Sequence, residues 1–305
     1  MRSLSIDILK IILSFFVVFL HMHVLRDTYP SLSYVLVNGL FRIAVPVFLI
    51  ITGYYFFYID TKDKLRKWLI RIFILYAIWT LIYIPFWKDD QYILNVLFGY
   101  HHLWYLIGTF FAGIILYIFR KQPVRTLSAA IFILFCIGYA LQFLGSIHYF
   151  KGELDIVLNT YPSYRNFLFV CFPFLGIGFL LKKQNIETRF SPSRVVVILS
   201  VILVMGEAYF NYKILGLNTK ESIDLLFSLL IACPVVFLYC KHIVVPTDSK
   251  ILASISTAIY LVHPLIMIWI FDLNLGMWED VVFILSLLAV SFLLVAINRK
   301  IKYLL

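Results

Sequence analysis

The chain has 305 residues, of which 63% are hydrophobic and 14% are charged, and its formal net charge at pH 7 is +10. Soluble globular domains carry about 25% charged residues, so this composition excludes a soluble domain and indicates an integral membrane protein. The positive charge does not indicate a nucleic-acid partner, because the basic residues lie in short loops between apolar segments rather than on one face of a soluble fold.

The first apolar segment, residues 4–25, contains Asp7, Lys10 and His21. Ionisable residues inside a membrane-length apolar segment are costly and usually mark function. The eleven-residue step from Lys10 to His21 corresponds to roughly 1100° of helical rotation, close to three full turns. Both side chains therefore leave the same face of the helix, with Asp7 and Ser14 close to that face. This pattern predicts a polar track along one side of a spanning helix.

Further apolar segments of membrane-spanning length follow. They predict an all-α, polytopic bundle of about ten transmembrane helices, forming a single domain over residues 1–305. The predicted spans are residues 4–25, 35–58, 66–87, 97–119, 124–147, 164–183, 194–212, 222–240, 251–271 and 278–298. Glu207 and Asp224 interrupt the seventh and eighth. No separate soluble domain is expected, because the longest polar loop, residues 146–163, is too short to hold a core.

The distribution of Lys and Arg predicts the orientation. Eighteen of the 26 lie on the side that contains both termini, six lie on the other side, and Lys10 and Arg42 lie within spans. Because cytoplasmic loops are enriched in Lys and Arg, both termini are predicted to be cytoplasmic, in a multi-pass protein of the cell membrane surrounded by membrane lipid.

In this orientation, the outer halves of six spans bring His, Arg or Glu side chains to a similar depth. These residues are His21, Arg42, His101 with His102, Arg165, Glu207 and His263. The pattern predicts a polar site used for catalysis or transport. On the cytoplasmic side, Lys67 and Arg71 lie one turn apart on one face of the third span.

Simpler interpretations remain open for several candidates. His102, Trp104 and Tyr105 could belong to an aromatic belt at the membrane interface, and Lys67 and Arg71 could be ordinary basic residues of a cytoplasmic loop. Gly53, Gly108, Gly176 and Gly178 are expected to allow helices to pack closely.

Metal and haem chemistry fit the pattern less well. His21 and His263 could face each other across a haem, but Arg42 and Glu207 would then have no role. His101 and His102 are neighbours, and neighbouring side chains on a helix diverge by about 100°, which does not suit one zinc ion. We therefore expect no metal site.

Several short motifs, in chain order, resemble those of a known family, the membrane acyltransferases of the acyltransferase-3 type. Asp7, Lys10 and His21 resemble the start of that family's first helix, where an acidic residue is followed by a basic residue and, eleven residues later, by histidine. The family usually has Arg at the position of Lys10. The other matching motifs are residues 42–54, the pair Lys67 and Arg71, residues 103–106, residues 164–176 and residues 260–263.

The resemblance implies an O-acyltransferase whose donor is acetyl-CoA or another acyl-CoA and whose acceptor is a hydroxyl of an extracytoplasmic or lipid-linked glycan. Lys67 and Arg71 would bind the donor's phosphates. His21 would act as general base or transient acyl acceptor, since imidazole exchanges protons near neutral pH, and Arg42 would stabilise the oxyanion. The remaining candidates are Lys10 on the polar track, His263 and Glu207 as orienting or proton-relaying groups, and His102, Trp104, Tyr105 and Arg165 as substrate-binding residues.

Two other functions remain open at this point. One branch that resembles the family is the membrane part of vancomycin-resistance serine racemases, which implies amino-acid transport. In that case Arg42 and Arg165 would bind a substrate carboxylate and Glu207 its ammonium group. The chain could also be a structural membrane subunit without chemistry of its own, and association into a homo-oligomer is compatible with any of these functions.

Overall fold

The computed structural model describes residues 3–87, 92–217, 222–247, 249–301 and 303–305. Within these residues, nine helical segments are long and apolar enough to cross a membrane. They confirm the prediction of an all-α, polytopic bundle. The nine segments are Leu4–Met22, Pro30–Phe56, Lys62–Phe86, His101–Phe119, Val124–Ser146, Tyr161–Lys183, Arg194–Lys213, Ile251–Phe271 and Gly276–Asn298.

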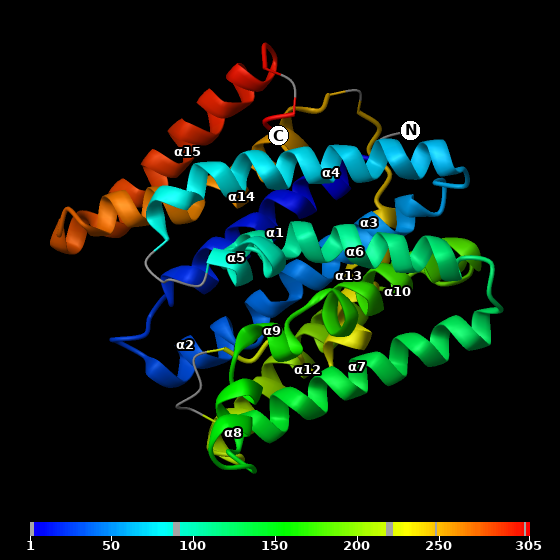
Figure 1. The fold of residues 1–305 in the computed structure, drawn as a ribbon, viewed down its shortest axis with the longest axis horizontal. Coiled ribbons are helices and arrows are strands. Elements are labelled where there is room, and N and C mark those ends of the chain that lie inside the picture. Colours follow the sequence, from blue (N-terminus) through cyan, green and yellow to red (C-terminus); the bar gives the residue numbers. More distant parts are fainter. Residues whose placement is uncertain (1–2, 88–91, 218–221, 248, 302) are drawn as a thin grey trace.

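Seven spans are built mainly on one long helix each. These helices are α1 (Leu4–Met22), α4 (Lys62–Tyr83), α6 (Trp104–Phe119), α7 (Val124–Ser146), α12 (Arg194–Lys213), α14 (Ile251–Phe271) and α15 (Glu279–Asn298). Short 3₁₀ turns extend three of them, namely η2 (Ile84–Phe86), η3 (His101–Leu103) and η6 (Gly276–Trp278). Figure 1 shows α4, α6 and α7 running roughly parallel across the molecule.

The other two spans are interrupted. The second consists of α2 (Pro30–Val37), a 3₁₀ turn η1 (Leu40–Ile43) and α3 (Ala44–Phe56), and the sixth consists of α9 (Tyr161–Tyr164), a π-helical turn η4 (Phe167–Cys171) and α10 (Phe172–Lys183). The connecting segments contain the short helices α5 (Tyr92–Phe98), α8 (Glu153–Leu158) and α11 (Ile186–Arg189). Breaks in spanning helices free backbone groups, which neighbouring side chains must satisfy.

The predicted eighth span differs most from expectation. Its helical part, α13, covers only Leu229–His242, which is shorter than a bilayer is thick. The preceding segment, residues 222–228, is not helical apart from a turn at its end, yet Ile223, Leu225 and Leu226 are buried. Backbone without helical hydrogen bonds is tolerated at membrane depth only where protein groups or a water-filled cavity satisfy it.

Polar side chains from three helical elements satisfy the backbone of residues 222–228. The Asn38 side chain, directly after α2, accepts a hydrogen bond from the amide of Ile223 at 2.9 Å. Gln142 of α7 accepts from the amides of Asp224 and Leu225 and donates to the carbonyl of Leu225, at 2.8 to 2.9 Å. Together with Glu207 of α12, described below, these residues hold the segment in place.

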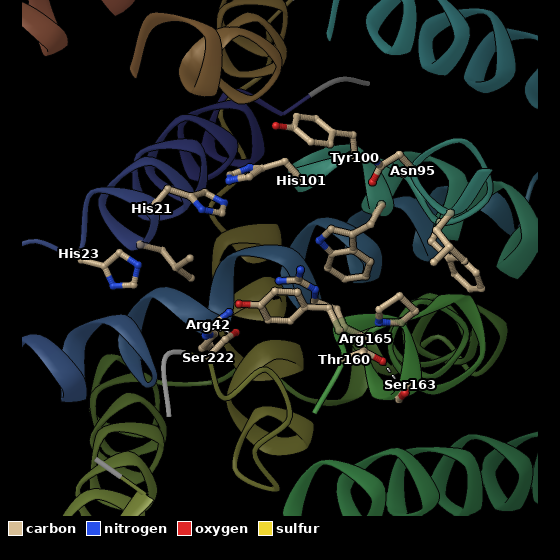
Figure 2. A pocket seen from close by; sticks show the side chains of 17 residues that line it. His21, His23, Arg42, Asn95, Tyr100, His101, Thr160, Ser163, Arg165 and Ser222 are labelled. Carbon is tan, nitrogen blue, oxygen red and sulfur yellow. Dashed lines mark hydrogen bonds between the residues drawn. The ribbon is translucent and has the colours of Figure 1, made fainter. Parts of the chain in front are cut away.

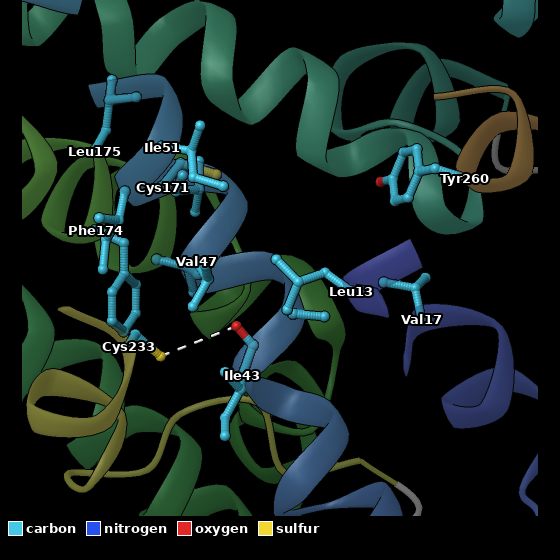
Figure 3. Close-up of a cluster of buried hydrophobic side chains, with 14 of the residues drawn as sticks. Leu13, Val17, Ile43, Val47, Ile51, Cys171, Phe174, Leu175, Cys233 and Tyr260 are labelled. Carbon is cyan, nitrogen blue, oxygen red and sulfur yellow. Dashed lines mark hydrogen bonds between the residues drawn. The ribbon is translucent and has the colours of Figure 1, made fainter. Parts of the chain in front are cut away.

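The centre of the bundle is α3, which packs against α1, α10 and α13. Figure 3 shows apolar side chains of these helices meeting, among them Leu13, Val47 and Phe174, with the Cys233 thiol 4.0 Å from the carbonyl oxygen of Ile43. Burial of such side chains against neighbouring helices fixes the relative positions of α1 and α3, which carry His21 and, through η1, Arg42.

Gly53 and Gly178 allow α3 and α10 to approach closely, as the sequence predicted. A Cβ atom on Gly53 would collide with the backbone of Leu175, and one on Gly178 would collide with the backbone of Ile50. Close approach through small residues is a common basis of helix packing in membranes, where no hydrophobic effect drives helices together.

The polar face of α1 is anchored to α14. Ser14 and Ser256 lie 2.7 Å apart through their hydroxyl oxygens, and both hydroxyls also lie 2.9 Å from the carbonyl oxygen of Lys10. This network fixes the register of α1 against α14, the helix that carries His263.

Candidate functional site

The larger of two main cavities, here called the histidine cavity, has a volume of about 780 Å³. Figure 2 shows the rings of His21 and His101 next to each other on one side of it, and Arg42 and Arg165 on another. Its lining includes Leu20 and His21 of α1, Arg42 of η1, Asn95 and Phe98 of α5, His101 of η3, Trp104 of α6, Thr160, Tyr161, Ser163 and Arg165 around α9, and Ser222. Segments far apart in the chain thus meet here.

Four histidines form a cluster at the wall of this cavity. The ring centroid of His21 lies 4.6 Å from that of His101 and 5.3 Å from that of His263, and His263 lies 5.1 Å from His102. His102 and His263 are buried, and neither ring nitrogen of His102 has a hydrogen-bond partner among the described residues. In the same part of the chain, no group of three or more His, Cys, Asp or Glu side chains is placed so that it could hold a metal ion.

The residue after His263 explains how its ring is held. Pro264 lies inside α14 and has no N–H, so the carbonyl oxygen of Tyr260 lacks its usual helical donor. Nδ1 of His263 lies 2.8 Å from that oxygen and takes the place of the missing donor. Nδ1 therefore carries the proton in the neutral ring, and the buried Nε2, which has no partner among the described residues, is left as an acceptor.

Arg42 forms the centre of an ionic network beside the histidines. Its guanidinium lies 2.5 Å from the carboxylate of Asp224 and donates to Asn38 at 3.1 Å and to Ser222 at 2.9 Å. Both ends of the Arg42–Asp224 pair are more than nine-tenths buried. Such a pair is tolerated inside a membrane because each charge offsets the other. The remaining guanidinium nitrogen of Arg42, Nε, has no hydrogen-bond partner among the described residues.

Arg165, directly after α9, approaches the same carboxylate. Its nearest nitrogen lies 3.8 Å from Asp224, and its guanidinium lies 4.0 Å from the ring centre of Tyr161 and 5.4 Å from that of Trp104. The break after α9 sets this position, because the Asn166 side chain accepts from the amides of Leu168 and Phe169 and starts the π-helical turn η4. Turns of this kind are frequent at functional sites.

A second cavity of about 440 Å³ lies along α1 on the side of Lys10, and we call it the basic cavity. Three cationic side chains line it, Lys10 of α1, Arg71 of α4 and Lys250 at the start of α14. Its polar lining also includes Thr52, Ser254 and Thr257, and its aromatic lining includes Tyr105 and Tyr260. The negative partner of Lys10 on its own helix is Asp7, 3.9 Å away.

A series of ring contacts connects the two cavities. It starts at His21 in the histidine cavity and continues through His263 and His102 to Tyr260 in the basic cavity, with ring centroids 5.1 to 5.3 Å apart at each step. The Tyr260 hydroxyl donates to the backbone carbonyl of His102 at 2.5 Å, which ties α14 to the start of α6. The polar face of α1 predicted from the sequence thus runs beside a chain of aromatic and imidazole rings.

The structure distributes the predicted site residues over several places. His21, Arg42, Trp104 and Arg165 line the histidine cavity, with His102 and His263 directly behind His21. Lys10, Arg71 and Tyr105 line the basic cavity. Lys67 is exposed on α4, outside the described lining of both cavities.

Glu207 lies apart from the other predicted residues. Its carboxylate accepts hydrogen bonds from the amides of Phe227 and Ser228 at 2.9 and 2.8 Å and from the Ser228 hydroxyl at 2.5 Å. These groups lie at the start of α13, where helical N–H groups lack partners, so Glu207 acts as the cap of that helix. It is not among the described residues that line either cavity.

Three residues in or beside the two cavities were given no role by the sequence-based predictions. Asp224 is the carboxylate of the histidine cavity's ionic network, although in the sequence it only interrupts an apolar segment. His101 was named but not assigned a role, and Lys250 was counted only as a loop residue. A polar residue interrupting a predicted span was the signal available for Asp224.

Comparisons with known proteins agree with the motifs. The family model described as an acyltransferase domain, of the acyltransferase-3 type, matches residues 3–297. The chain is 22% identical over 298 residues to a protein named amino-acid racemase from Enterococcus faecalis, covering 90% of this chain and 42% of that protein. It is 23% identical over 288 residues to a serine/alanine racemase from Enterococcus gallinarum, covering 87% of this chain and 41% of that protein.

The chain therefore spans less than half the length of these two relatives. No solved structure matches it. Because the family model covers nearly all of the chain, and the described residues contain nine helices able to cross a membrane, the protein is a multi-pass membrane member of the acyltransferase-3 family.

Proposed function

We propose that this protein transfers an acyl group, in the simplest case acetyl, from an acyl-CoA in the cytoplasm to a hydroxyl of an extracytoplasmic or lipid-linked glycan. The observation that supports this best is the pair of cavities along one face of α1, with Lys10 in one and His21 in the other. A donor and an acceptor that meet from opposite sides of a membrane need two such openings and a reactive group between them.

The basic cavity suits the donor. CoA carries several phosphate groups, and Lys10, Arg71 and Lys250 supply positive charge from three different helices. Lys67, one turn before Arg71, would add positive charge near the entrance. The thioester would extend past Tyr105 and Tyr260 towards the ring series that ends at His21.

The chemistry is assigned to the histidine cavity. The acceptor hydroxyl gives its proton to His21, its oxygen bonds to the thioester carbonyl carbon, and the carbon–sulfur bond breaks. The departing thiolate takes up the proton from His21, which leaves free CoA and an O-acylated glycan. His263 stacks against the His21 ring, with ring centroids 5.3 Å apart, and so helps to orient it.

Arg42 is the candidate for oxyanion stabilisation. Asp224, Asn38 and Ser222 hold its two terminal nitrogens, so the guanidinium is fixed before substrate arrives. A fixed donor in a water-poor site stabilises developing negative charge far better than the same group in water. The unpartnered Nε is the N–H that remains for this role.

Amino-acid transport is the second candidate, favoured by the names of the two racemase relatives. Arg42 and Arg165 would then hold the carboxylate of serine. The ammonium group fits less well, because Glu207 binds the start of α13 and the Asp224 carboxylate already pairs with Arg42. Acyl transfer uses the basic cavity and the histidines together, which transport of a small amino acid does not require.

The decisive experiment compares His21→Ala with wild type in membrane vesicles supplied with radiolabelled acetyl-CoA. If His21 is the base or acyl carrier, transfer of label to membrane glycan falls by about 10² to 10⁴-fold. His148→Ala is the matched control, because His148 lies on an exposed loop and pairs with Asp155. Normal labelling by folded His21→Ala protein contradicts the proposal, and uptake of labelled serine without acetyl transfer favours the transporter.

A further inference from the structure

Among the described residues around the histidine cavity, arginine side chains outnumber carboxylates. Arg42 and Arg165 both face Asp224, and among the described residues lining this cavity and the small cavity beside it, Asp224 is the sole carboxylate. Asp224 lies much closer to Arg42, at 2.5 Å, than to Arg165, at 3.8 Å. Its other oxygen accepts a hydrogen bond from Ser222 at 3.0 Å. Within the described part of the chain, this carboxylate therefore offsets Arg42 more fully than Arg165.

Arg165 is the guanidinium that remains available. Its side chain is 15% exposed, and its contact with Asp224, at 3.8 Å, is longer than a hydrogen bond. The rings of Tyr161 and Trp104 cover its flat faces. Contact with aromatic faces stabilises a cation but leaves the N–H groups at the edge of the plane free to donate. A largely buried cation whose charge is only partly offset favours an anionic ligand.

The position of Arg165 is held by the fold rather than by a ligand. Tyr161 and Pro162 begin the short helix α9, and Asn166 both donates to the carbonyl of Pro162 and caps the next turn. The guanidinium is thereby fixed on the wall opposite His21, across the same cavity. A group bound to Arg165 and a group beside His21 can belong to one molecule.

We infer that the acceptor carries an anionic group, a carboxylate or a phosphate, which binds Arg165 while an acceptor hydroxyl lies at His21. This inference rests on the proposed acyl transfer and adds the charge of the acceptor. The planar fork of arginine matches two oxygens of either anion. Asn95, Thr160 and Ser163 supply neutral polar groups around it, and Trp104 and Tyr161 supply aromatic surface, which suits a sugar bearing the anion.

The test measures binding separately from acyl transfer. Purified full chain in nanodiscs is titrated, by thermal shift, with methyl glucuronide, glucose 1-phosphate, uncharged methyl glucoside and L-serine. We expect the two anionic sugars to stabilise wild type. The neutral glucoside should need about tenfold or more higher concentration for the same shift in unfolding temperature, because charge-assisted hydrogen bonds contribute strongly to binding. The difference between the glucuronide and the phosphate tells which anion the acceptor carries.

Variants link the effect to Arg165. Arg165→Gln removes the preference for anionic sugars, Arg165→Lys retains part of it through its charge, and Arg26→Gln, on an exposed loop residue, leaves it unchanged. Equal binding of neutral and anionic sugars by wild type, or an undiminished preference in folded Arg165→Gln, overturns the inference. So does stabilisation by L-serine alone, since the anion would then belong to an amino acid.

Failure of this inference and failure of the proposed function are distinguishable. If wild type acetylates neutral glycans and Arg165→Gln does so equally well, acyl transfer stands and the anion subsite is wrong. If anionic sugars bind through Arg165 but label from acetyl-CoA never reaches them, the subsite stands and the acyl chemistry is wrong.

Discussion

Several intramembrane polar residues serve the backbone in the structure, among them the predicted site residues Glu207 and His263. Asn38, Gln142 and Glu207 satisfy amides of residues 222–228, and Nδ1 of His263 replaces the N–H that Pro264 lacks. An unsatisfied backbone amide at membrane depth costs several kcal/mol, so the fold needs these hydrogen bonds for its stability. An ionisable residue within a span therefore marks either a site or a break in a helix, and its partners decide which.

Glu207→Gln separates these two roles. The amide can replace only one carboxylate oxygen and carries no charge at the start of α13, so we expect a loss of about 1 to 3 kcal/mol in the free energy of unfolding. Tryptophan fluorescence during thermal unfolding in detergent measures it. Glu153→Gln, at an exposed position at the start of the short helix α8, is the control. Unchanged stability with lost acetyl transfer would instead support the prediction that Glu207 relays protons.

At the scale of elements, broken helices bring the site together. The break at Asn38 between α2 and η1 turns Arg42 towards Asp224, and the break after α9 does the same for Arg165. Unbroken helices such as α3 and α10 provide the rigid frame against which these breaks are held, through contacts at Gly53 and Gly178. Irregular backbone thus carries Arg42 and Arg165, whereas His21 and His263 lie on the regular helices α1 and α14.

Two glycine variants test this frame. Gly53→Ala should destabilise the protein by about 1 to 3 kcal/mol, because its methyl group would force α3 away from the backbone of Leu175. Gly206→Ala in α12, where a methyl group would meet open space, should be neutral or stabilise by about 0.5 to 1 kcal/mol. Thermal unfolding of both variants under the same conditions provides the comparison. Equal stability of the two would show that close approach of α3 and α10 is not needed.

At the scale of the whole molecule, the proposal depends on which cavity faces the cytoplasm. The excess of Lys and Arg on one side of the spans predicts that Lys10, and with it the basic cavity, lies towards the cytoplasm. The proposed donor is a cytoplasmic acyl-CoA. In the opposite orientation the basic cavity would face away from the cytoplasm, which would contradict the proposed donor site.

Cysteine labelling tests the orientation directly. Lys62→Cys and Lys151→Cys place thiols on exposed residues at predicted cytoplasmic and outer loops respectively. In intact cells, a membrane-impermeant maleimide should modify Lys151→Cys and should reach Lys62→Cys only after the membrane is opened. Wild type measures the background from its own four cysteines. The reverse labelling pattern would contradict the predicted topology.

Most of the fold was predictable from the sequence. Nine of the ten predicted spans, with their approximate bounds, follow from apolar length. The shared face of Lys10 and His21 follows from helical periodicity, and both apolar length and periodicity are local properties. The structure keeps this face and places a cavity near each end of it. The eighth span was the exception, since its hydrophobicity does not reveal that residues 222–228 are held by side chains from distant helices.

The carboxylates show what only the tertiary structure decided. In the sequence, Glu207 and Asp224 look alike, each interrupting an apolar span. In the folded chain, Glu207 caps α13 while Asp224 joins Arg42 and Arg165 at the cavity. Composition and periodicity determined that this is a membrane bundle with a polar helix face, since those signals lie within single segments. Which charges meet across the bundle depends on contacts between segments far apart in the chain, and these exist only once the helices have packed.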